Sequence, residues 1–382
     1  MPWVDESRLD DPDALRVLDT RDSLRSLASA GAQVRRALVS AEEAGIQRAA
    51  GGERPRSVLV AALGGSSLVC DVLDLLAEPG SPVPVTTRGG PPLPGWVGPL
   101  DLVIAVSQSG RATGPLALAA EAARRGASLL TVGAAGSPLA DVSARARGVH
   151  VDVALPTPSS RTALWSLLTP VLLAADAMGL VRCPLGVLEG VADVLDEVAE
   201  ECRPSSEAFV NPAKILALGL GETVPIVLGD GPLTGVAATR AASMLARTAR
   251  VPATYGALPD AASQVVACLD GPFGSGLTAS SPGGDIFADP FLDAPPSPRL
   301  GLLTLRDPDL DPQQVALTDA VVASARESGV TVWEQLAHRG EPIERLASLV
   351  ALTDYASTYL ALGLGLDPSV SRHVTELRDR TS

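Results

Sequence analysis

Hydrophobic and polar positions follow two patterns that alternate along much of the chain. Short runs rich in Val, Ile and Leu are typical of strands buried on both faces, and stretches with apolar residues at helical spacing follow them. In the first half this pattern predicts strands at 57–62, 83–86, 101–106, 128–132 and 149–153, with helices at 66–77, 113–125 and 137–146. Strands and helices in such alternation form a doubly wound parallel sheet.

Helical patterns flank this first sheet. Residues 11–48 have apolar positions spaced as in two lead-in helices, and residues 161–178 predict a further helix. Residues 185–202 form an amphipathic connecting segment with one apolar stripe. Asn211 followed by Pro212 is a typical helix start, because Asn caps exposed N–H groups and Pro suits the first turn.

The strand and helix pattern begins again at Val224. Further strands are expected at 250–254, 264–268, 301–305 and 330–336, with helices at 233–249, 312–328 and 342–363 and a short helix from Asp367. A Gly- and Pro-rich stretch, 271–298, predicts a long irregular loop. The expected organisation is N-terminal helices (1–50), a first domain (51–182), a helical connector (183–222) and a second domain with C-terminal helices (223–382).

Composition narrows the range of functions that the protein can have. The 382 residues exceed what one hydrophobic core usually fills, which favours two domains. A net charge of −14 opposes binding to nucleic acid or to anionic membranes. The four cysteines lack CxxC spacing, the first residues lack a leader pattern, and no apolar run has the length of a membrane span, so we expect a cytoplasmic protein. Neither metal-ligand spacing nor a nucleotide-binding motif is present, so we expect no cofactor.

Two Gly/Ser segments follow neighbouring predicted strands, Gly64-Gly65-Ser66-Ser67 and Ser107-Gln108-Ser109-Gly110. The carboxyl ends of parallel strands lie at one edge of a sheet, where ligands bind. Hydroxyl groups and free N–H groups before a helix favour an anion, and phosphate fits this description. The alternative is that these residues only form turns, as Gly and Ser often do after strands.

These motifs resemble the sugar isomerase (SIS) domain family and, within it, the bifunctional phosphoglucose/phosphomannose isomerases. Besides the two Gly/Ser segments and Thr113, the resemblance rests on the turn from Pro156 to Arg161, the NPAK segment at 211–214 and the closing Tyr359-Leu360-Ala361 with Asp367-Pro368. It covers most of the chain, from about Val58 to the C-terminus.

The resemblance implies two SIS domains, a homodimer and a hexose 6-phosphate or related phosphosugar as ligand. The phosphate would be held by the Gly/Ser segments and the following helix, that is by Gly65, Ser66, Ser67, Ser107, Ser109 and Thr113. Arg161 would approach the sugar. The alternative for Arg161 is a surface ion pair at the start of a helix.

One departure from the family concerns catalysis. Isomerisation of an aldose to a ketose needs a base that moves a proton between two carbons and an acid that opens the ring. In the family these are a Glu and a His, and the matching tracts here, 245–252 and 258–265, carry Arg247 and Ser263 instead. An arginine near neutral pH cannot take a proton from carbon.

Other residues leave alternatives open. Arg247 and Arg250 fit a structural role at a helix end, where cations are favoured, or they add positive charge beside an anionic ligand. Asp260 is a weak candidate for a substitute base. We therefore weigh an isomerase with relocated acid and base residues, a phosphosugar sensor or regulatory subunit without proton transfer, and a purely structural dimer.

Overall fold

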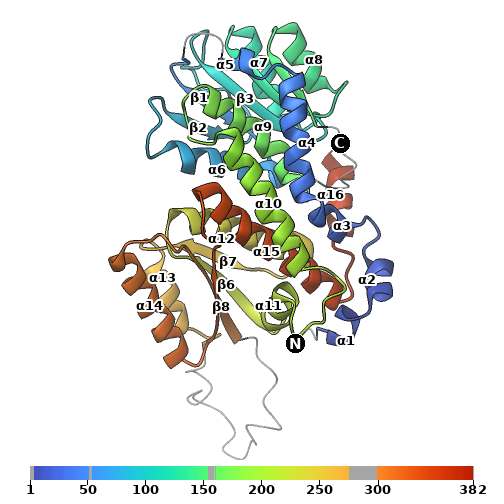
Figure 1. The fold of residues 1–382 in the computed structure, drawn as a ribbon, viewed down its shortest axis with the longest axis vertical. Coiled ribbons are helices and arrows are strands. Elements are labelled where there is room, and N and C mark those ends of the chain that lie inside the picture. The colour runs from blue at the N-terminus through green and yellow to red at the C-terminus, as the bar shows by residue number, and fades with distance from the viewer. Residues whose placement is uncertain (1–3, 51–53, 154–158, 160, 275–298, 382) are drawn as a thin grey trace, which may run out of the picture. The chain divides into compact units, whose positions relative to one another are not determined.

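The computed structural model describes residues 4–50, 54–153, 159, 161–274 and 299–381. The chain forms two compact units, each built on one parallel sheet (Figure 1). The sheet A unit contains Arg25–Glu197 and Glu341–Glu344, and the sheet B unit contains Met1–Leu24, Val198–Gly340 and Arg345–Ser382. The α/β class predicted from the alternating pattern is confirmed.

Sheet A has the strand order β2-β1-β3-β4-β5, and all its neighbours are parallel. Its strands are β1 (Val58–Ala61), β2 (Val85–Arg88), β3 (Leu102–Ser107), β4 (Ser128–Gly133) and β5 (Val149–Asp152). Chain order runs outward from β1 in both directions, as in a doubly wound sheet. All five predicted strands are present, with boundaries that differ by about two residues at most.

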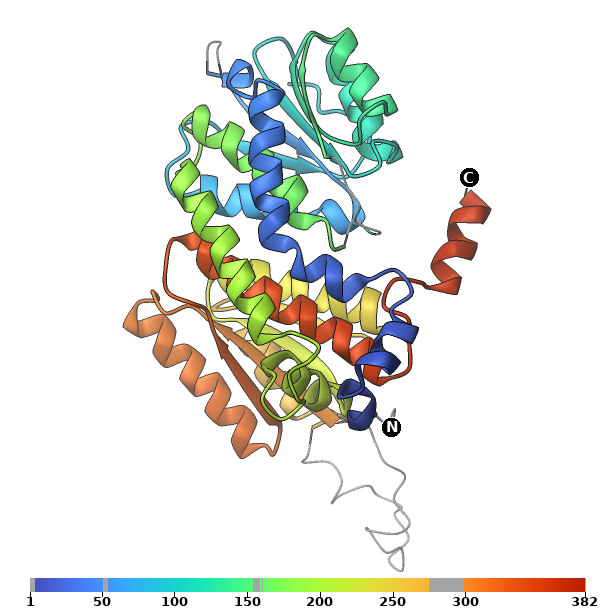
Figure 2. The ribbon, with the colours of Figure 1, turned by 45° about the vertical axis from the view of Figure 1, so that its right-hand side comes forward.

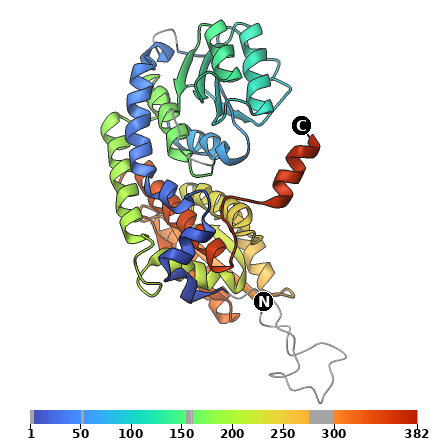
Figure 3. The ribbon, with the colours of Figure 1, turned by 90° about the vertical axis from the view of Figure 1, so that its right-hand side faces the viewer.

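Two layers of helices cover sheet A (Figure 3). The helices that lie wholly within this unit are α4 (Ala30–Glu43), α5 (Gln47–Ala50), α6 (Leu68–Ala77), α7 (Thr113–Arg124), α8 (Pro138–Arg145) and α9 (Leu164–Ala177). One face of the sheet packs against α7 and α8, and the other against α4 and α9. Small aliphatic residues fill the α7 side, among them Leu59, Ala61, Val103 and Ala105.

Sheet B has the order β7-β6-β8-β9, again parallel. Its strands are β6 (Thr223–Gly229), β7 (Thr254–Ala257), β8 (Arg299–Arg306) and β9 (Thr331–Leu336). Helix α14 lies on one side of this sheet and α15 on the other (Figure 2). The longer helices of the unit are α11 (Pro212–Gly221), α12 (Pro232–Met244), α13 (Ala262–Leu269), α14 (Pro312–Glu327), α15 (Pro342–Gly363) and α16 (Arg372–Thr381).

Some predicted elements differ from the structure. Residues 264–268 belong to α13 and not to a strand, because Val265 and Leu269 are buried at helical spacing while Ala267 and Cys268 between them face solvent. The expected strand at 250–254 begins only at Thr254. Most of the predicted loop 271–298 lies outside the described residues.

The helices outside the two sheets also differ in part from the prediction. Where two lead-in helices were expected, the chain forms α1 (Glu6–Leu9), α2 (Pro12–Leu18), α3 (Ser23–Ala28), α4 and α5. The final helix begins at Arg372, beyond the expected start at Asp367. The connecting helix α10 (Leu185–Glu201) matches its prediction and spans the boundary between the units.

The start of α11 is confirmed in detail. Asn211 Oδ1 accepts hydrogen bonds from the N–H groups of Ala213 and Lys214, at 3.0 and 3.1 Å. Lys214, the only lysine of the chain, is fully buried, and its Nζ donates to Asp10 Oδ1 and to the carbonyls of Pro204 and Ser206. Three acceptors satisfy the ammonium group, which explains how burial of this charge is tolerated.

Close packing of α7 against the end of β2 generates a testable prediction. A Cβ on Gly114 would lie 1.9 Å from the carbonyl oxygen of Gly89, so a side chain there requires the backbone to move. We expect Gly114→Ala to lower the free energy of unfolding by about 1–3 kcal/mol, measured by chemical denaturation. Gly95→Ala, where a Cβ meets no atom within 4 Å, is the control and should change little. Equal stability of the two variants would contradict this packing.

Candidate functional site

The two Gly/Ser segments lie at the same edge of sheet A. Strands β1 and β3 are direct neighbours, and Ala61, the last residue of β1, pairs with Ala105 of β3. Residues Gly64–Ser66 form a 3-10 turn after β1, and residues 107–112 connect β3 to α7. The segments that the sequence placed next to each other therefore extend from paired strands.

Some of the hydroxyl-bearing residues at this edge are buried and others are exposed. Ser66 and Ser107 are buried, whereas Ser67, Ser109 and Thr113 are exposed. Ser107 Oγ accepts from the N–H of Ala112, and Ser109 Oγ accepts from the N–H of Arg111, both at 3.3 Å. Each of these two hydroxyls still has its own hydrogen to donate, because the bonds observed use only the oxygen as acceptor.

Glycine shapes the second of these segments. Gly110 has φ +63°, and a Cβ there would lie 2.0 Å from Ser137 Oγ. Its N–H donates to the carbonyl of Ser107 at 2.8 Å, which closes a tight turn immediately before α7. The turn leads directly into α7, and the first N–H groups of a helix lack an acceptor within the helix and attract anions.

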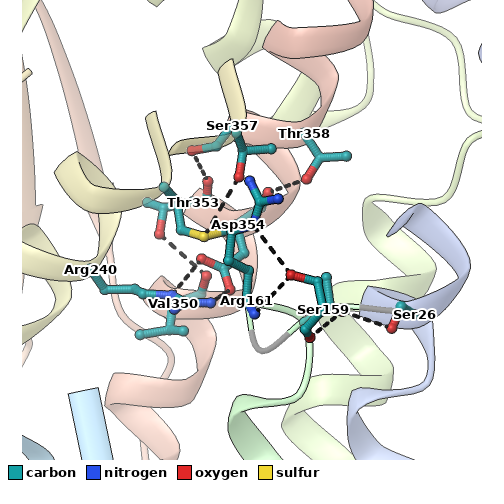
Figure 4. Close-up of polar contacts among 12 residues, drawn as sticks. Ser26, Ser159, Arg161, Arg240, Val350, Thr353, Asp354, Ser357 and Thr358 are labelled. Atoms are coloured by element: carbon teal, nitrogen blue, oxygen red, sulfur yellow. Dashed lines mark hydrogen bonds and ion pairs between the residues drawn. The ribbon is translucent and has the colours of Figure 1, made fainter. Parts of the chain in front are cut away.

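Arg161 follows β5 and precedes α9 in the same unit. Its backbone N–H and its Nε both donate to Ser159 Oγ at 3.2 Å (Figure 4). Residues 154–158 and 160, which include most of the predicted Pro-rich turn, lie outside the described residues. Contact between Arg161 and a sugar remains a prediction.

The tract 245–252, which the resemblance matches to the Glu-bearing segment of the isomerases, belongs to the sheet B unit. Arg247 lies on a π-helical turn, Leu245–Ala249, that continues α12. Such turns are uncommon and are frequent at functional sites. Loss of water around the guanidinium and, secondarily, the charge of Arg240 lower the pKa of Arg247. Arg240 itself is buried, and its Nε and Nη2 are paired with the two carboxylate oxygens of Asp354 at 3.0 and 2.8 Å (Figure 4).

The other polar candidates of the two tracts are half-buried or exposed in the sheet B unit. Arg250, in a left-handed conformation, donates to the carbonyls of Thr248 at 3.1 Å and Asp367 at 2.7 Å, so it holds the C-terminal segment. Asp260 is exposed in the turn before α13, and Ser263 is exposed on the first turn of that helix. These contacts give Arg250 a structural role, while a catalytic role for Asp260 remains a prediction.

The corresponding edge of sheet B has a different chemistry. Strands β6 and β8 are neighbours, as β1 and β3 are, but Asp230 and Asp307 follow them in place of serines. Both carboxylate oxygens of Asp230 accept from the N–H of Asp307, at 3.1 and 3.0 Å, and Thr234 donates to one of them at 2.8 Å. Carboxylates repel a phosphate and Arg345 Nε already pairs with Asp307 Oδ1 at 3.0 Å, so the edge of sheet A suits an anionic ligand better than this one.

Burial of Asp230 raises the pKa of its carboxyl group to about 6. A folded-state pKa above the unfolded value means that the neutral form stabilises the fold, and that this stability is lost as the pH rises from about 4 through about 6. We expect Asp230→Asn to gain about 1–3 kcal/mol of unfolding free energy over the wild type between about pH 4 and pH 7. Chemical denaturation across this pH range measures it.

The matched control is Asp270→Asn, which changes an exposed carboxylate of the same unit. The difference in unfolding free energy between this variant and the wild type should not change with pH over the same range. If the unfolding free energy of Asp230→Asn differed from that of the wild type by the same amount at every pH, burial would not raise the pKa of this carboxyl group.

Sequence reasoning missed two arginines at the sheet A edge. Arg88 is the last residue of β2 and pairs with Ala61, and Arg111 lies within the segment between β3 and α7. Both are exposed. Arg111 could have been identified because it directly follows Ser109-Gly110, whereas the place of Arg88 depends on the pairing of β2 with β1.

The described part of the chain contains no helix long and apolar enough to span a membrane. It also contains no group of three or more His, Cys, Asp or Glu residues placed to hold a metal ion.

Comparison with known proteins agrees with the motifs. Residues 209–381 match the family described as the bacterial phospho-glucose isomerase C-terminal SIS domain. A bifunctional phosphoglucose/phosphomannose isomerase of Caldicellulosiruptor bescii is 27% identical over 199 residues. That match covers 52% of this chain and 58% of the relative, so it spans little more than half the length of either protein.

Solved structures show the same fold at low sequence identity. A hypothetical protein of Thermus thermophilus aligns with a TM-score of 0.68 at 13% identity, covering 97% of this chain and 93% of its own. Tagatose-6-phosphate ketose/aldose isomerase of Escherichia coli aligns with a TM-score of 0.65 at 12% identity, covering 92% of this chain and 95% of its own. At these identities the likeness establishes the fold alone.

Residues 209–381 are thus similar to a SIS domain, and the fold of two parallel sheets is similar to that of the solved structures. Over about half of its length the chain also resembles a bifunctional phosphoglucose/phosphomannose isomerase.

Proposed function

We propose that the protein binds a hexose 6-phosphate or a closely related phosphosugar at the carboxyl edge of sheet A, without isomerising it. The observation that carries the proposal is the pair of Gly/Ser segments on adjacent strands, with the hydroxyl hydrogens of Ser107 and Ser109 still to be donated. A phosphate ester accepts several hydrogen bonds at once and so fits this set of donors.

Each residue has a defined part in this binding. The N–H groups around Gly65 and at the start of α7 face the phosphate, and hydroxyl groups from both segments donate to its oxygens. These hydroxyl groups belong to Ser66, Ser67, Ser107, Ser109 and Thr113. Arg161 contacts the sugar.

The absence of proton transfer follows from the two replaced residues. Arg247 and Ser263 occupy the positions of the family's Glu and His. Even with a lowered pKa an arginine stays protonated near neutral pH, so it has no lone pair with which to take a proton from carbon. In the alternative, the protein is an active isomerase in which Asp260 serves as the base. The similarity to a bifunctional phosphoglucose/phosphomannose isomerase is the observation that favours this alternative.

We also propose where the protein is located and with what it assembles. As a member of a class of phosphosugar-binding proteins it would be cytoplasmic and would act as a sensor or as the regulatory subunit of a larger assembly. The resemblance implies a homodimer. The net charge of −14 argues against nucleic acid as a partner.

Removal of one donor tests the binding site. We expect Ser109→Ala to weaken binding of glucose 6-phosphate by about 1–3 kcal/mol, because one hydrogen bond to a charged oxygen is lost. Isothermal titration calorimetry measures the affinity. Ser128→Ala, at the amino end of β4 and exposed, is the control and should bind as the wild type does. Unchanged affinity of Ser109→Ala would exclude this placement of the phosphate.

Hydrogen exchange separates binding from catalysis. Fructose 6-phosphate and glucose 6-phosphate are each incubated with the protein in D₂O, and deuterium at the carbon next to the carbonyl is followed by NMR. We expect thermal stabilisation of the protein by both sugars with no incorporation above the rate without protein. Incorporation that depends on protein concentration and is lost in Asp260→Asn would establish the isomerase alternative.

A further inference from the structure

The end of β2 brings a cation to the sheet A edge. Arg88 is the last residue of β2 and pairs with Ala61 of β1, and its carbonyl accepts the N–H of Ala62 at 3.3 Å. The 3-10 turn Gly64–Ser66 begins shortly after Ala62. Arg88 thus lies directly beside the strand from which the first Gly/Ser segment extends.

Strand register places Arg88 on the face of the sheet that α7 covers. Residues paired in a parallel ladder point to the same face. Ala61 belongs to the core cluster that contains Leu118 and Ala119 of α7. Its partner Arg88 is therefore on the α7 face. Ser107 is on that face as well, because side chains alternate along β3 and Ala105 of the same strand belongs to the same cluster.

The chain after Arg88 packs against the first turn of α7. A Cβ on Gly114 would lie 1.9 Å from Gly89 O and 3.2 Å from Gly90 Cα, so these backbones are in close contact. The residues that follow β2 cannot move away from the start of α7 without breaking this contact. The contact therefore fixes the backbone next to Arg88 beside the start of α7, from which its long side chain extends.

The segments that follow β1, β2 and β3 carry a net positive charge, and the first acidic residue after the 64–67 segment is Asp71, in the first turn of α6. No carboxylate is present in the residues that directly follow β1, β2 and β3, namely 62–67, 89–95 and 108–112. Arg88 and Arg111 bring positive charge to the same edge, a local excess in a protein of net charge −14. The end of β5 carries Asp152, whose Oδ1 accepts from the N–H of Ala135 at 2.8 Å.

We propose that Arg88 is a specificity-determining residue that selects a dianionic phosphate ester over singly charged or neutral sugars. The inference rests on the proposed function, because it assigns a further residue to the same site. A guanidinium donates two parallel hydrogen bonds to a phosphate, which hydroxyl groups alone cannot match in charge or geometry.

The experiment compares glucose 6-phosphate with glucose 6-sulfate, which has a similar shape but a single negative charge. Calorimetry measures both affinities for the wild type, Arg88→Gln, Arg88→Lys and Arg147→Gln. Arg147 is an exposed arginine of the same unit that precedes β5, so it belongs to the opposite edge of sheet A. Thermal unfolding of each variant without ligand verifies that the fold is kept.

We expect Arg88→Gln to lower affinity for the phosphate ester by about 10- to 100-fold and for the sulfate ester by less. Arg88→Lys should recover part of the loss, and Arg147→Gln should bind as the wild type does. If the wild type binds and Arg88→Gln binds as tightly as Arg147→Gln, the role of Arg88 is refuted but the proposed function is not. Failure of the wild type to bind either ester would instead refute the proposed function.

Discussion

Adjacency of β1 and β3 in sheet A is the constraint on which the proposed binding site depends. Two segments separated by about forty residues of sequence meet because their strands pair in parallel, with Ala61 opposite Ala105. The hydrogen-bonded ladder fixes the relative position of both segments, and α7 begins directly after the second. Donors on rigid elements lose little conformational freedom when a ligand binds, which is how such an edge can hold a small anion.

The two sheets share a strand arrangement but differ in chemistry at the equivalent edge. After β6 and β8 the chain places Asp230 and Asp307, and their hydrogen bonds with each other and with Thr234 satisfy the polar groups internally. After β1 and β3 the chain places serines, and the hydroxyl hydrogens of Ser107 and Ser109 are still available. The same topology thus yields a closed polar network in one unit and an open set of donors in the other.

Much of the fold could be predicted, because buried parallel strands are distinct in sequence. Strand β3 is a continuous apolar run, and Asn211-Pro212 marks the start of α11. Residues 264–268 were predicted wrongly, since a short run with two valines fits a strand or one face of a helix equally well, and only packing of Val265 and Leu269 decides. For the candidate site, the position of the serines at one sheet edge could be predicted because Gly and Ser directly follow apolar runs. The position of Arg88 could not, because it depends on which strand lies beside β1.

Binding of a phosphosugar at the edge of sheet A is tested most directly by a crystal structure of the protein with fructose 6-phosphate. We expect phosphorus density at that edge, with phosphate oxygens within hydrogen-bond distance of Ser107 and Ser109 Oγ and of the N–H groups that begin α7. Density for the sugar phosphate at the edge of sheet B, or at neither edge with ligand at saturating concentration, would contradict this placement.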